Sequence, residues 1–344
     1  MRTLAALLVV SLSAAACSRA PRDSGPAALV ERARVSMGSE LRLTAWTADE
    51  PLAVSAFDEA FFEFDRLDDL LTVWRDDSDV QRLNAAAGEG PVQVGPEVRE
   101  ILRLAREASE LTGGRFDVTF GALADVWRFD HDQSDRVPPR DEIDARLPLV
   151  DYRKVHVDDR AGTAYIARKG MRVHLGGIGK GYAVDRAAAV LRRRGISDFL
   201  IQAGGDLYAS GRHGNRPWRL GIRDPRGPAD KSFAAIDLSN GTFSTSGDYE
   251  RFFFAGGRRY HHILDPATGE PARGCRSVTL VTDRAVFADA LAKGAFILGP
   301  VEGMALIERL PNVEGVIVSS TNEVLVSSGL KDRLTMLTPP TNAP

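Results

Sequence analysis

Hydrophobic residues recur at helical spacing in four stretches of the chain. Residues 51–71 and 96–112 place apolar side chains every three or four positions, which predicts two amphipathic helices. The second pattern stops at Gly113, a residue type that commonly ends helices. Residues 285–298 and 302–309 predict two further helices.

Alternating and continuous apolar runs predict strands between these helices. Residues 40–46 alternate between apolar and polar positions, and residues 199–203 form a short run of the kind found in buried strands. Residues 130–148 are charged, contain Pro138 and Pro139, and predict a surface loop. Because strands and helices do not alternate regularly, their order favours an α+β fold. Weaker strand patterns lie at residues 91–94, 154–157, 164–167, 218–222, 233–238, 242–244, 277–282, 313–319 and 323–327.

The first residues have the layout of an export signal. Arg2 precedes an apolar run from Leu4 to Ala16 that is too short to span a bilayer, and small residues precede Cys17. This layout resembles a bacterial lipoprotein signal and predicts a signal peptide with a lipobox over residues 1–17. A cleaved signal with an incidental cysteine is the alternative. We expect an exported chain that lipidated Cys17 anchors to the membrane, facing the periplasm.

The rest of the chain is predicted to be a tether followed by one soluble domain. Residues 18–30 are rich in Pro, Ser and Gly, and residues 31–335 are expected to form a single domain, with no long apolar segment after the signal. The net charge is −3 and the longest basic run is the arginine triplet 192–194, which disfavours nucleic-acid binding. Cys275 is the only cysteine after Cys17, which excludes a disulfide framework and a cysteine-rich metal site.

A glycine-rich loop is the first feature that suggests chemistry. The segment VHLGGIGKGYAVDRAAAVLRRRG begins at Val173, has four glycines and one lysine between Gly176 and Gly181, and continues as a helical pattern. It lacks the spacing of a Walker loop and of the dinucleotide-binding fingerprint. Glycines let the backbone approach a ligand closely, and a helix N-terminus beside Lys180 would attract a diphosphate. A tight packing turn without a ligand is the alternative.

Further motifs accompany this loop, and together they resemble the FAD:protein FMN transferase (ApbE) family. The loop resembles the family's D-L-G-G-I-A-K-G-Y-A signature, and STSGDYERFFFAGGRRYHHILDPATGEP at residues 244–271 resembles T-S-G-x-Y…H-I-x-D-P-x-T-G-x-P nearly residue for residue. The resemblance runs in order over about residues 35–328. The other matches are MGS at 37–39, TVWRDDSDVQRLN at 72–84, TGGRFDVTFGAL at 112–123, LIQAGGDLYASG at 200–211 and FADALAKGAFILG at 287–299.

The resemblance implies a fold, an activity and a set of site residues. The fold is an ApbE-like, T-fold-related arrangement of mixed sheets with packed helices. The activity uses Mg²⁺ to cleave FAD and attaches FMN through a phosphoester to a threonine of an acceptor protein, for which the family suggests Nqr- or Rnf-type respiratory subunits. His262 matches the implied general base, and Gly177, Asp289 and Lys293 fall at implied metal positions. The implied FAD contacts are Met37, Trp74, Arg115, Phe116, Asp117, His174, Lys180 and Leu264.

Some of these positions depart from the family's pattern. Lys293 stands where a metal-binding threonine is usual, His174 replaces an aspartate, and Gln202 replaces an asparagine. Lys293 follows Asp289 by four residues, so the lysine is placed to pair with the carboxylate on one helix face and to occupy the cation position. Two other functions therefore stay open: a FAD-binding module that lacks Mg²⁺ chemistry, and a FAD pyrophosphatase.

Overall fold

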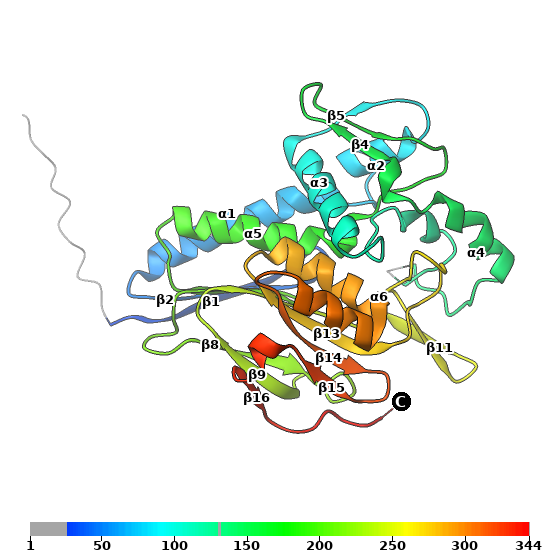
Figure 1. Ribbon diagram of the computed structural model, residues 1–344. Helices are drawn as coiled ribbons and strands as arrows, with labels where there is room; N and C mark the ends of the chain where they lie inside the picture. The colour runs from blue at the N-terminus through cyan, green and yellow to red at the C-terminus, as the bar shows by residue number, and fades with distance from the viewer. Residues whose placement is uncertain (1–25, 130–131, 344) are drawn as a thin grey trace, which may run out of the picture.

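The computed structural model describes residues 26–129 and 132–343, and an eight-stranded sheet forms its centre (Figure 1). All neighbouring strands of this sheet are antiparallel. Strand β13 is buried along its whole length, as expected for a strand covered on both faces. In spatial order the strands are β1 (Ala28–Ser36), β2 (Ser39–Thr47), β6 (Phe199–Ala203), β7 (Asp206–Ser210), β10 (Gly241–Gly247), β13 (Cys275–Thr282), β14 (Glu314–Ser319) and β15 (Val324–Val326).

Helices cover one face of this sheet (Figure 1). They are α1 (Glu50–Leu71), α5 (Gly179–Arg193), α6 (Ala285–Arg309) and, packed on the outside of α6, α3 (Pro96–Leu111). Helix α1 begins where the side chain of Asp49 accepts a hydrogen bond from the backbone N–H of Leu52 at 3.0 Å. The carboxylate of Asp185, on α5, accepts hydrogen bonds from the first N–H groups of α6, at Ala285 and Val286 (2.8 and 3.1 Å). The N-termini of α5 and α6 are therefore held in a fixed relation.

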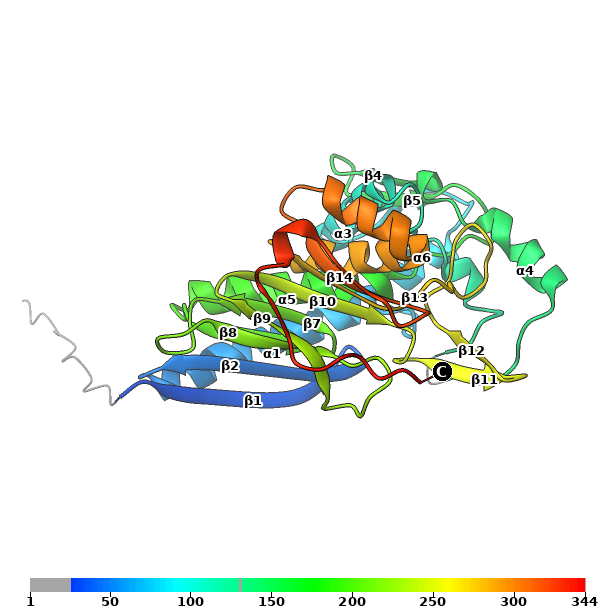
Figure 2. The same cartoon turned by 60° about the horizontal axis from the view of Figure 1, so that its bottom comes forward.

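A small sheet covers the opposite face of the large one (Figures 1 and 2). Its strands, in spatial order, are β16 (Leu334–Met336), β9 (Ser232–Leu238) and β8 (Trp218–Arg223). The apolar core between the two sheets includes Trp218, Phe233, Phe243 and Val318. The large sheet thus has a core on each of its faces, one shared with helices and one shared with strands.

The remaining elements surround the helical layer. Figures 1 and 2 both show α4 and β11 at the same end of the molecule. Short 3-10 helices connect several of these elements. The elements are α2 (Asp79–Ala85), α4 (Arg140–Arg146), the sheet of β3 (Val92–Gln93), β5 (Thr163–Ile166) and β4 (Val155–Asp158), and the hairpin of β11 (Phe252–Ala255) and β12 (Arg258–His261).

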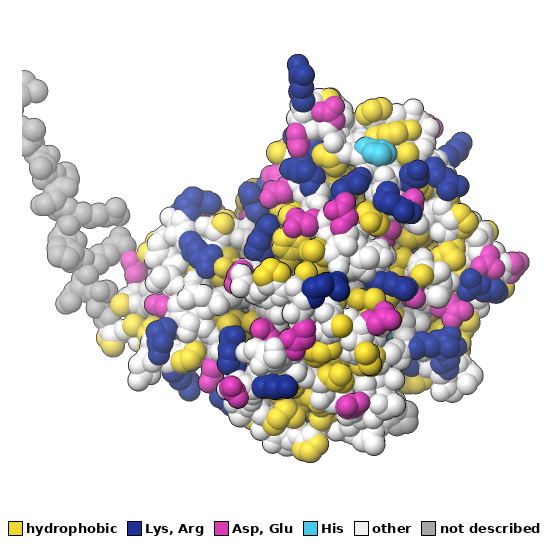
Figure 3. Space-filling view, in the orientation of Figure 1, with side chains coloured by type: hydrophobic (Ala, Val, Ile, Leu, Met, Phe, Trp, Pro, Cys, Tyr) yellow, Lys and Arg dark blue, Asp and Glu magenta, His cyan; other side chains and the backbone are white. Residues whose placement is uncertain are grey.

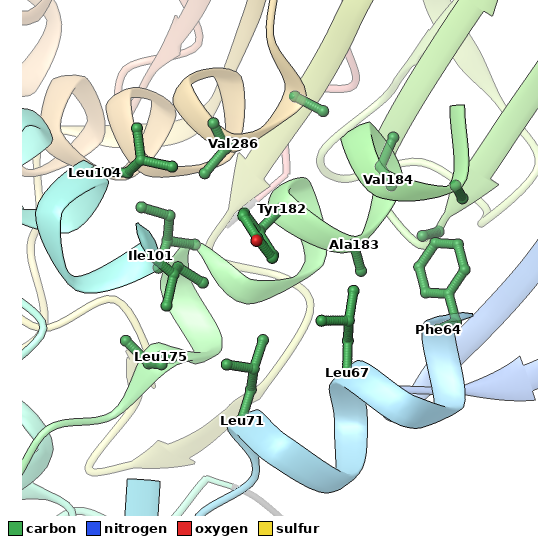
Figure 4. Packing of buried hydrophobic residues seen from close by; sticks show 14 of the residues in the cluster. Phe64, Leu67, Leu71, Ile101, Leu104, Leu175, Tyr182, Ala183, Val184 and Val286 are labelled. Atoms are coloured by element: carbon green, nitrogen blue, oxygen red, sulfur yellow. The ribbon is translucent and has the colours of Figure 1, made fainter. Parts of the chain in front are cut away.

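A buried core between helices holds the glycine-rich loop in place (Figure 4). Leu67 and Leu71 of α1 lie against α5, where Tyr182 and Ala183 are almost fully buried. Leu175, inside the glycine-rich loop, lies beside Leu71 in the same core. The loop backbone is therefore anchored by an apolar side chain on each side of its glycines, which is a rigid base for a ligand site.

Most of the predicted helices and strands are confirmed within a few residues. The helices predicted before and after residue 300 are the two halves of α6, which non-helical backbone at Gly299 (φ 84°) interrupts next to Pro300. The predicted loop over residues 130–148 is wrong in part, because α4 forms within it. Pro139 stands directly before that helix, at an end where proline is tolerated.

Five strands lacked a prediction: β1, β7, β11, β12 and β16. Strand β1 begins at Ala28, inside the segment 18–30 that was expected to be a tether, and β16 ends at Met336, just past the expected domain end. Each of these strands is short or alternates weakly, and its partner strand supplies the pairing that local sequence does not specify. The predicted signal peptide, the lipobox and most of the tether lie outside the described residues.

The expectation that no long apolar segment follows the signal does not hold for helix α6. Among the described residues it is the one helix that is long and apolar enough, by length and composition alone, to cross a membrane. More than half of its most apolar window (56%) is buried inside the protein, where it packs on β10, β13 and β14. A central helix of a folded core shows the same composition, and we assign α6 that place.

Charges of both signs are interspersed on the face shown in Figure 3. Many charged side chains of the protein form ion pairs, such as Arg140 with Asp144 at 2.7 Å and Arg193 with Glu59 at 2.6 Å. That face offers no extended basic surface of the kind that nucleic-acid phosphates require.

Candidate active site

The candidate site is a cleft of two adjoining pockets beside the glycine-rich loop. Phe129, His174, Gly176 and Arg251 line both pockets, so the two are continuous. The first, which we call the His262 pocket, is lined by residues that include Arg115, Phe116, Asp117, Phe120, Gly177, His262, Leu264 and Lys293. The second, the Trp74 pocket, is lined by residues that include Met37, Asp68, Trp74, Gly179 and Lys180.

The glycine-rich loop forms a wall common to both pockets. It turns through one 3-10 helix, Leu175–Gly177, before α5 begins. The Nδ1 atom of His174 accepts a hydrogen bond from the backbone N–H of Gly176 at 3.1 Å, which orients the imidazole. A Cβ atom at Gly177 would lie only 3.2 Å from Cδ of Lys293. The absence of a side chain at Gly177 therefore leaves room for the stem of Lys293 beside the loop.

Asp289 and Lys293 form an ion pair on one face of α6, which confirms the pairing expected from their spacing. The ammonium of Lys293 contacts Oδ1 of Asp289 and donates to its backbone carbonyl at 3.2 Å. The other carboxylate oxygen, Oδ2, accepts a hydrogen bond from the backbone N–H of Gly181 at 3.0 Å. Asp289 is fully buried, whereas the side chain of Lys293 is 19% exposed and lines the His262 pocket. Lys293 is thus the member of the pair that faces the cleft.

A second buried carboxylate, Asp206, extends this charge network. Its Oδ1 accepts a hydrogen bond from the hydroxyl of Ser244 at 2.5 Å, and its Oδ2 lies 3.5 Å from Nζ of Lys180. Burial disfavours the charged form of Lys180, but the carboxylates of Asp206 and Asp289 outweigh burial and leave its pKa above the ordinary value. Burial and the charge of Asp206 raise the pKa of Asp289, and the two lysines oppose that shift.

The residues at the implied metal positions do not fit a Mg²⁺ ion as they are arranged. Magnesium requires oxygen ligands in an octahedron, and a protonated lysine offers only N–H donors. Lys293 and the N–H of Gly181 already bond the two oxygens of Asp289. Within residues 26–129 and 132–343, no three His, Cys, Asp or Glu side chains are grouped so that they could hold a metal. The structure therefore does not support Lys293 as a metal ligand, because its ammonium stands where the ion would be.

His261 and His262 are adjacent in sequence but differ in their surroundings. The ring of His261 is satisfied, since Nε2 donates to the carbonyl of Ala272 at 2.7 Å and Nδ1 accepts from the N–H of Ile263 at 3.3 Å. The Nδ1 atom of His262, by contrast, has no hydrogen-bond partner in the described part of the chain. Burial and, after it, neighbouring cationic groups hold the pKa of His262 well below its ordinary value. The ring is therefore neutral near pH 7 and has an unprotonated nitrogen, although the lowered pKa makes it a weaker base than an exposed histidine.

Three more of the predicted FAD contacts form a wall of the His262 pocket. Phe116 and Leu264 are buried and present apolar surface to it. Arg115 reaches the same wall, where its guanidinium donates to Oδ1 of Asp265 at 3.1 Å. The structure thus brings Arg115 and Phe116 together with His262 and Leu264, although the two pairs come from distant parts of the sequence.

Asp117 also lines the His262 pocket, but its carboxylate is committed to the local backbone. Oδ1 accepts from the backbone N–H and the hydroxyl of Thr119 at 2.8 and 2.6 Å, and Oδ2 accepts from the N–H of Tyr152 at 2.8 Å. Burial raises its pKa, and these hydrogen bonds oppose that shift. Asp117 therefore stabilises the turn that carries Phe116. Its carboxylate lies behind the pocket wall and holds that wall in position.

Met37 and Trp74, two of the predicted FAD contacts, both line the Trp74 pocket. Met37 and Gly38 form the two-residue turn between β1 and β2, and both have positive φ (48° and 67°). This mirror-image turn favours Asn-Gly, and a methionine in the left-handed region costs about 1–2 kcal/mol. The side chain of Trp74 is 53% exposed at the edge of the pocket. An exposed indole and a strained methionine both face the space where a flat ring would bind.

Three features of the site are not predicted from the sequence: Arg251, Phe129 and the role of Asp206. Arg251 lines both pockets, yet nothing in its local pattern marks it beyond its place inside the motif at residues 244–271. The ring of Phe129 stacks with Trp127 and Phe253 at centroid distances of 5.7 and 5.5 Å. This aromatic cluster depends on contacts between distant segments, which periodicity does not report.

A cleft with a glycine-rich loop at a helix N-terminus, several cationic groups and a neutral histidine defines a protein built to bind a nucleotide and act on its phosphates. Residues 37–317 match the ApbE family, and the chain belongs to this family. The match covers every predicted site residue, from Met37 to Lys293.

Characterised relatives and solved structures agree with this membership. The FAD:protein FMN transferase of Treponema pallidum is 33% identical over 324 residues, which make up 89% of each chain. That of Klebsiella pneumoniae is 32% identical over 305 residues, 88% of this chain and 93% of its own. The ApbE protein of Thermotoga maritima superposes with a TM-score of 0.82 at 32% identity, covering 89% of this chain and 99% of its own. The flavin transferase ApbE of Vibrio cholerae gives 0.79 at 27% identity, covering 90% and 100%. The predicted family and the α+β, ApbE-like fold are confirmed.

Proposed function

We propose that this chain is a FAD:protein FMN transferase that cleaves FAD and attaches FMN through a phosphoester to a threonine of an acceptor protein. The observation that carries this proposal is that His262 lines the same pocket as Lys293 and Arg251, and that its buried Nδ1 atom has no hydrogen-bond partner among the described residues. A neutral base beside fixed positive charge suits attack by a hydroxyl on a phosphate.

The proposed reaction exchanges a phosphoanhydride bond of FAD for a phosphoester bond to the acceptor. The threonine oxygen bonds to the phosphorus of the FMN half of FAD, the bond from that phosphorus to the AMP oxygen breaks, and AMP leaves. His262 accepts the proton that the hydroxyl loses. Lys180, Lys293 and Arg251 compensate the negative charge on the phosphate oxygens, which is the main contribution that proteins make to phosphoryl transfer.

The two pockets suit the two parts of FAD that matter for this reaction. The Trp74 pocket combines a half-exposed indole with Met37, so we assign it the isoalloxazine ring. The loop at the N-terminus of α5 would hold the diphosphate, with Lys180 and Lys293 flanking it. This placement brings the scissile bond toward His262.

Mg²⁺ has a reduced place in this proposal. The family resemblance implies a magnesium ion at Gly177, Asp289 and Lys293, where it would supply positive charge to the diphosphate. Because the carboxylate is already bonded by Lys293 and Gly181, we propose that FMN transfer has only a weak requirement for Mg²⁺.

The acceptor and the location are proposed from the sequence. The name FAD:protein FMN transferase, carried by relatives, indicates a protein acceptor, and we propose an Nqr- or Rnf-type subunit with a target threonine. The N-terminal layout supports export, lipidation of Cys17 and a membrane-bound position that faces the periplasm. The tether would let the domain reach acceptor domains on that side of the membrane.

Mass spectrometry of an acceptor tests the proposed reaction. The full chain is incubated with FAD, with or without Mg²⁺, and with the soluble domain of an Nqr-type subunit that carries a candidate threonine. The domain should gain the mass of FMN less water while AMP is released in equal amount, and a Thr→Val version of the domain should gain nothing.

Two other outcomes would point to the alternatives. Release of AMP and free FMN, with no change in the acceptor, would indicate a FAD pyrophosphatase. Stable FAD binding without cleavage, with every acceptor tried, would indicate a binding module. Either result would contradict the transferase.

A further inference from the structure

The ammonium of Lys293 holds a position that a cation bound to Asp289 would need. It contacts Oδ1 of Asp289 and donates to the backbone carbonyl of the same residue at 3.2 Å. The backbone N–H of Gly181 donates a hydrogen bond to the second carboxylate oxygen, Oδ2, at 3.0 Å. A divalent ion at Oδ1 of Asp289 would lie beside the Lys293 ammonium and be repelled by it, so the ammonium would have to move before the ion could bind.

The charges around Asp289 are already balanced without a metal. Two buried carboxylates, Asp206 and Asp289, are matched by two lysines, Lys180 and Lys293, with ion-pair contacts between the members of each pair. Without a bound diphosphate, a divalent ion added to this group would leave two positive charges uncompensated in a buried site, which is unfavourable. A threonine at position 293 would remove one of the two lysine charges near Asp289. Oδ1 of Asp289 would then be available to bind a metal.

The cleft is shaped so that this ammonium can reach a ligand. Gly177 leaves space for the stem of Lys293, since a Cβ atom there would come within 3.2 Å of Cδ. The lysine side chain keeps 19% of its surface exposed and lines the same pocket as His262. An ammonium has three N–H donors, so one of them remains available for a phosphate oxygen while two bond Asp289.

We propose that Lys293 takes the place of a divalent cation, and that this chain holds the diphosphate of FAD through the Lys293 ammonium without a metal. The identity of the ligand rests on the proposed function. The metal-free character rests on the contacts of this chain's own residues.

Flavin-fluorescence titration and Mn²⁺ binding test the inference without using transfer. The full chain is titrated with FAD in EDTA and in Mg²⁺, and Mn²⁺ binding is followed separately by electron paramagnetic resonance. The variants are Lys293→Met, which removes the charge at similar length, and Lys293→Thr, which adds an oxygen. Lys169→Met removes an exposed lysine that does not line either pocket, and serves as the control.

The wild type should bind FAD equally well in EDTA and in Mg²⁺, and should bind no more Mn²⁺ than an Asp289→Asn variant does. Lys293→Met should weaken FAD binding about 10- to 100-fold in both buffers, the effect of losing one charged hydrogen bond. Lys293→Thr should weaken it similarly in EDTA, regain at least about 10-fold of affinity in Mg²⁺, and acquire Mn²⁺ binding. Lys169→Met should match the wild type throughout.

The inference is overturned if Mg²⁺ raises the affinity of the wild type for FAD about 10-fold or more, or if the wild type binds Mn²⁺ at a site that Asp289→Asn abolishes. These two results need no position-293 variant, so they decide the matter even if such a variant does not fold. FAD affinity of Lys293→Met equal to that of the wild type would also overturn it. Failure to modify any acceptor, with the expected binding pattern intact, would instead contradict the proposed transfer and leave this inference standing.

Discussion

The backbone N–H of Gly181 donates to Oδ2 of Asp289 at 3.0 Å, although the two residues are 108 positions apart in sequence. This contact joins the first turn of α5 to α6, next to the hydrogen bonds from α6 to Asp185. The glycine-rich loop and the carboxylate that anchors Lys293 therefore behave as one rigid unit. A substitution at the start of α5 should therefore displace the Asp289 carboxylate and the Lys293 ammonium that it anchors.

A side chain at Gly181 should destabilise this unit. A Cβ atom there would lie 2.3 Å from the carbonyl oxygen of Ala285 and 2.8 Å from Cβ of Asp289, so α5 and α6 would have to separate. We expect Gly181→Ala to lower the free energy of unfolding by about 1–3 kcal/mol, the usual cost of overpacking, and to weaken FAD binding. Urea unfolding measures the first effect. Gly90→Ala is the control, because nothing lies within 4 Å of a Cβ atom at Gly90; equal stability of the two variants would refute the close-packing argument.

Replacement of Trp74 should weaken flavin binding with little effect on stability. Its indole is 53% exposed, so little apolar burial is lost, while a stacked aromatic contributes about 1–3 kcal/mol to binding a flat ring. Trp74→Ala should therefore raise the dissociation constants of FAD and of riboflavin alike, as measured by fluorescence titration. Phe62→Ala is a matched control, since Phe62 is 68% exposed and lines neither pocket.

The same titration tests the role of the glycine-rich loop. The wild type should bind FAD more tightly than riboflavin, because only FAD carries a diphosphate for the loop and Lys180. Equal affinities would argue against diphosphate binding at the loop, whatever the effect of Trp74→Ala.

The buried neutral His261 should make stability depend on pH. Burial lowers its pKa in the folded chain, whereas the unfolded value is about 6.5. Below about pH 6.5 the unfolded chain binds more protons, so stability is full above that pH and falls as the pH drops toward the folded pKa, by at most about 1.4 kcal/mol per pH unit for this residue. Urea unfolding between pH 7.5 and 5.5 should show a smaller loss for His261→Gln than for the wild type. Identical slopes would mean that His261 is not buried in its neutral form.

The predicted anchor has a direct cellular test. If Cys17 is lipidated, the wild type should fractionate with membranes, and Cys17→Ser should appear in the soluble exported fraction. Cell fractionation followed by immunoblotting distinguishes the two. Wild-type protein found free in a detergent-free periplasmic extract would count against lipidation, and retention of Cys17→Ser on membranes would point to a different anchor.

The hydrophobic pattern predicts the helices whose apolar stripes and ends are determined by nearby residues. Helices α1 and α3 carry apolar stripes and clear ends, and α6 was divided at Gly299 because glycine and proline interrupt helices. Strands β11 and β12 were missed because they are short and because Phe253 packs on a distant aromatic cluster rather than on an alternating face of a large sheet. Their existence depends on tertiary contacts.

The site residues likewise fall into contacts that the sequence predicts and contacts that depend on the tertiary structure. The Asp289–Lys293 pair was predictable because four residues on a helix place two side chains together. The pairing of Lys180 with Asp206, and the exposure of Arg251 to both pockets, depend on how separate strands and helices meet. Likewise, only the structure distinguishes the satisfied ring of His261 from that of His262.

If His262 takes the proton of the acceptor hydroxyl, the rate of acceptor modification must fall when its imidazole is removed. The His262→Ala variant should transfer FMN about 10²–10⁴-fold more slowly than the wild type, as expected for loss of a general base. Its affinity for FAD should stay near that of the wild type, and His261→Gln should keep most of the transfer rate. Transfer by His262→Ala at the wild-type rate, with FAD binding intact, would contradict the account.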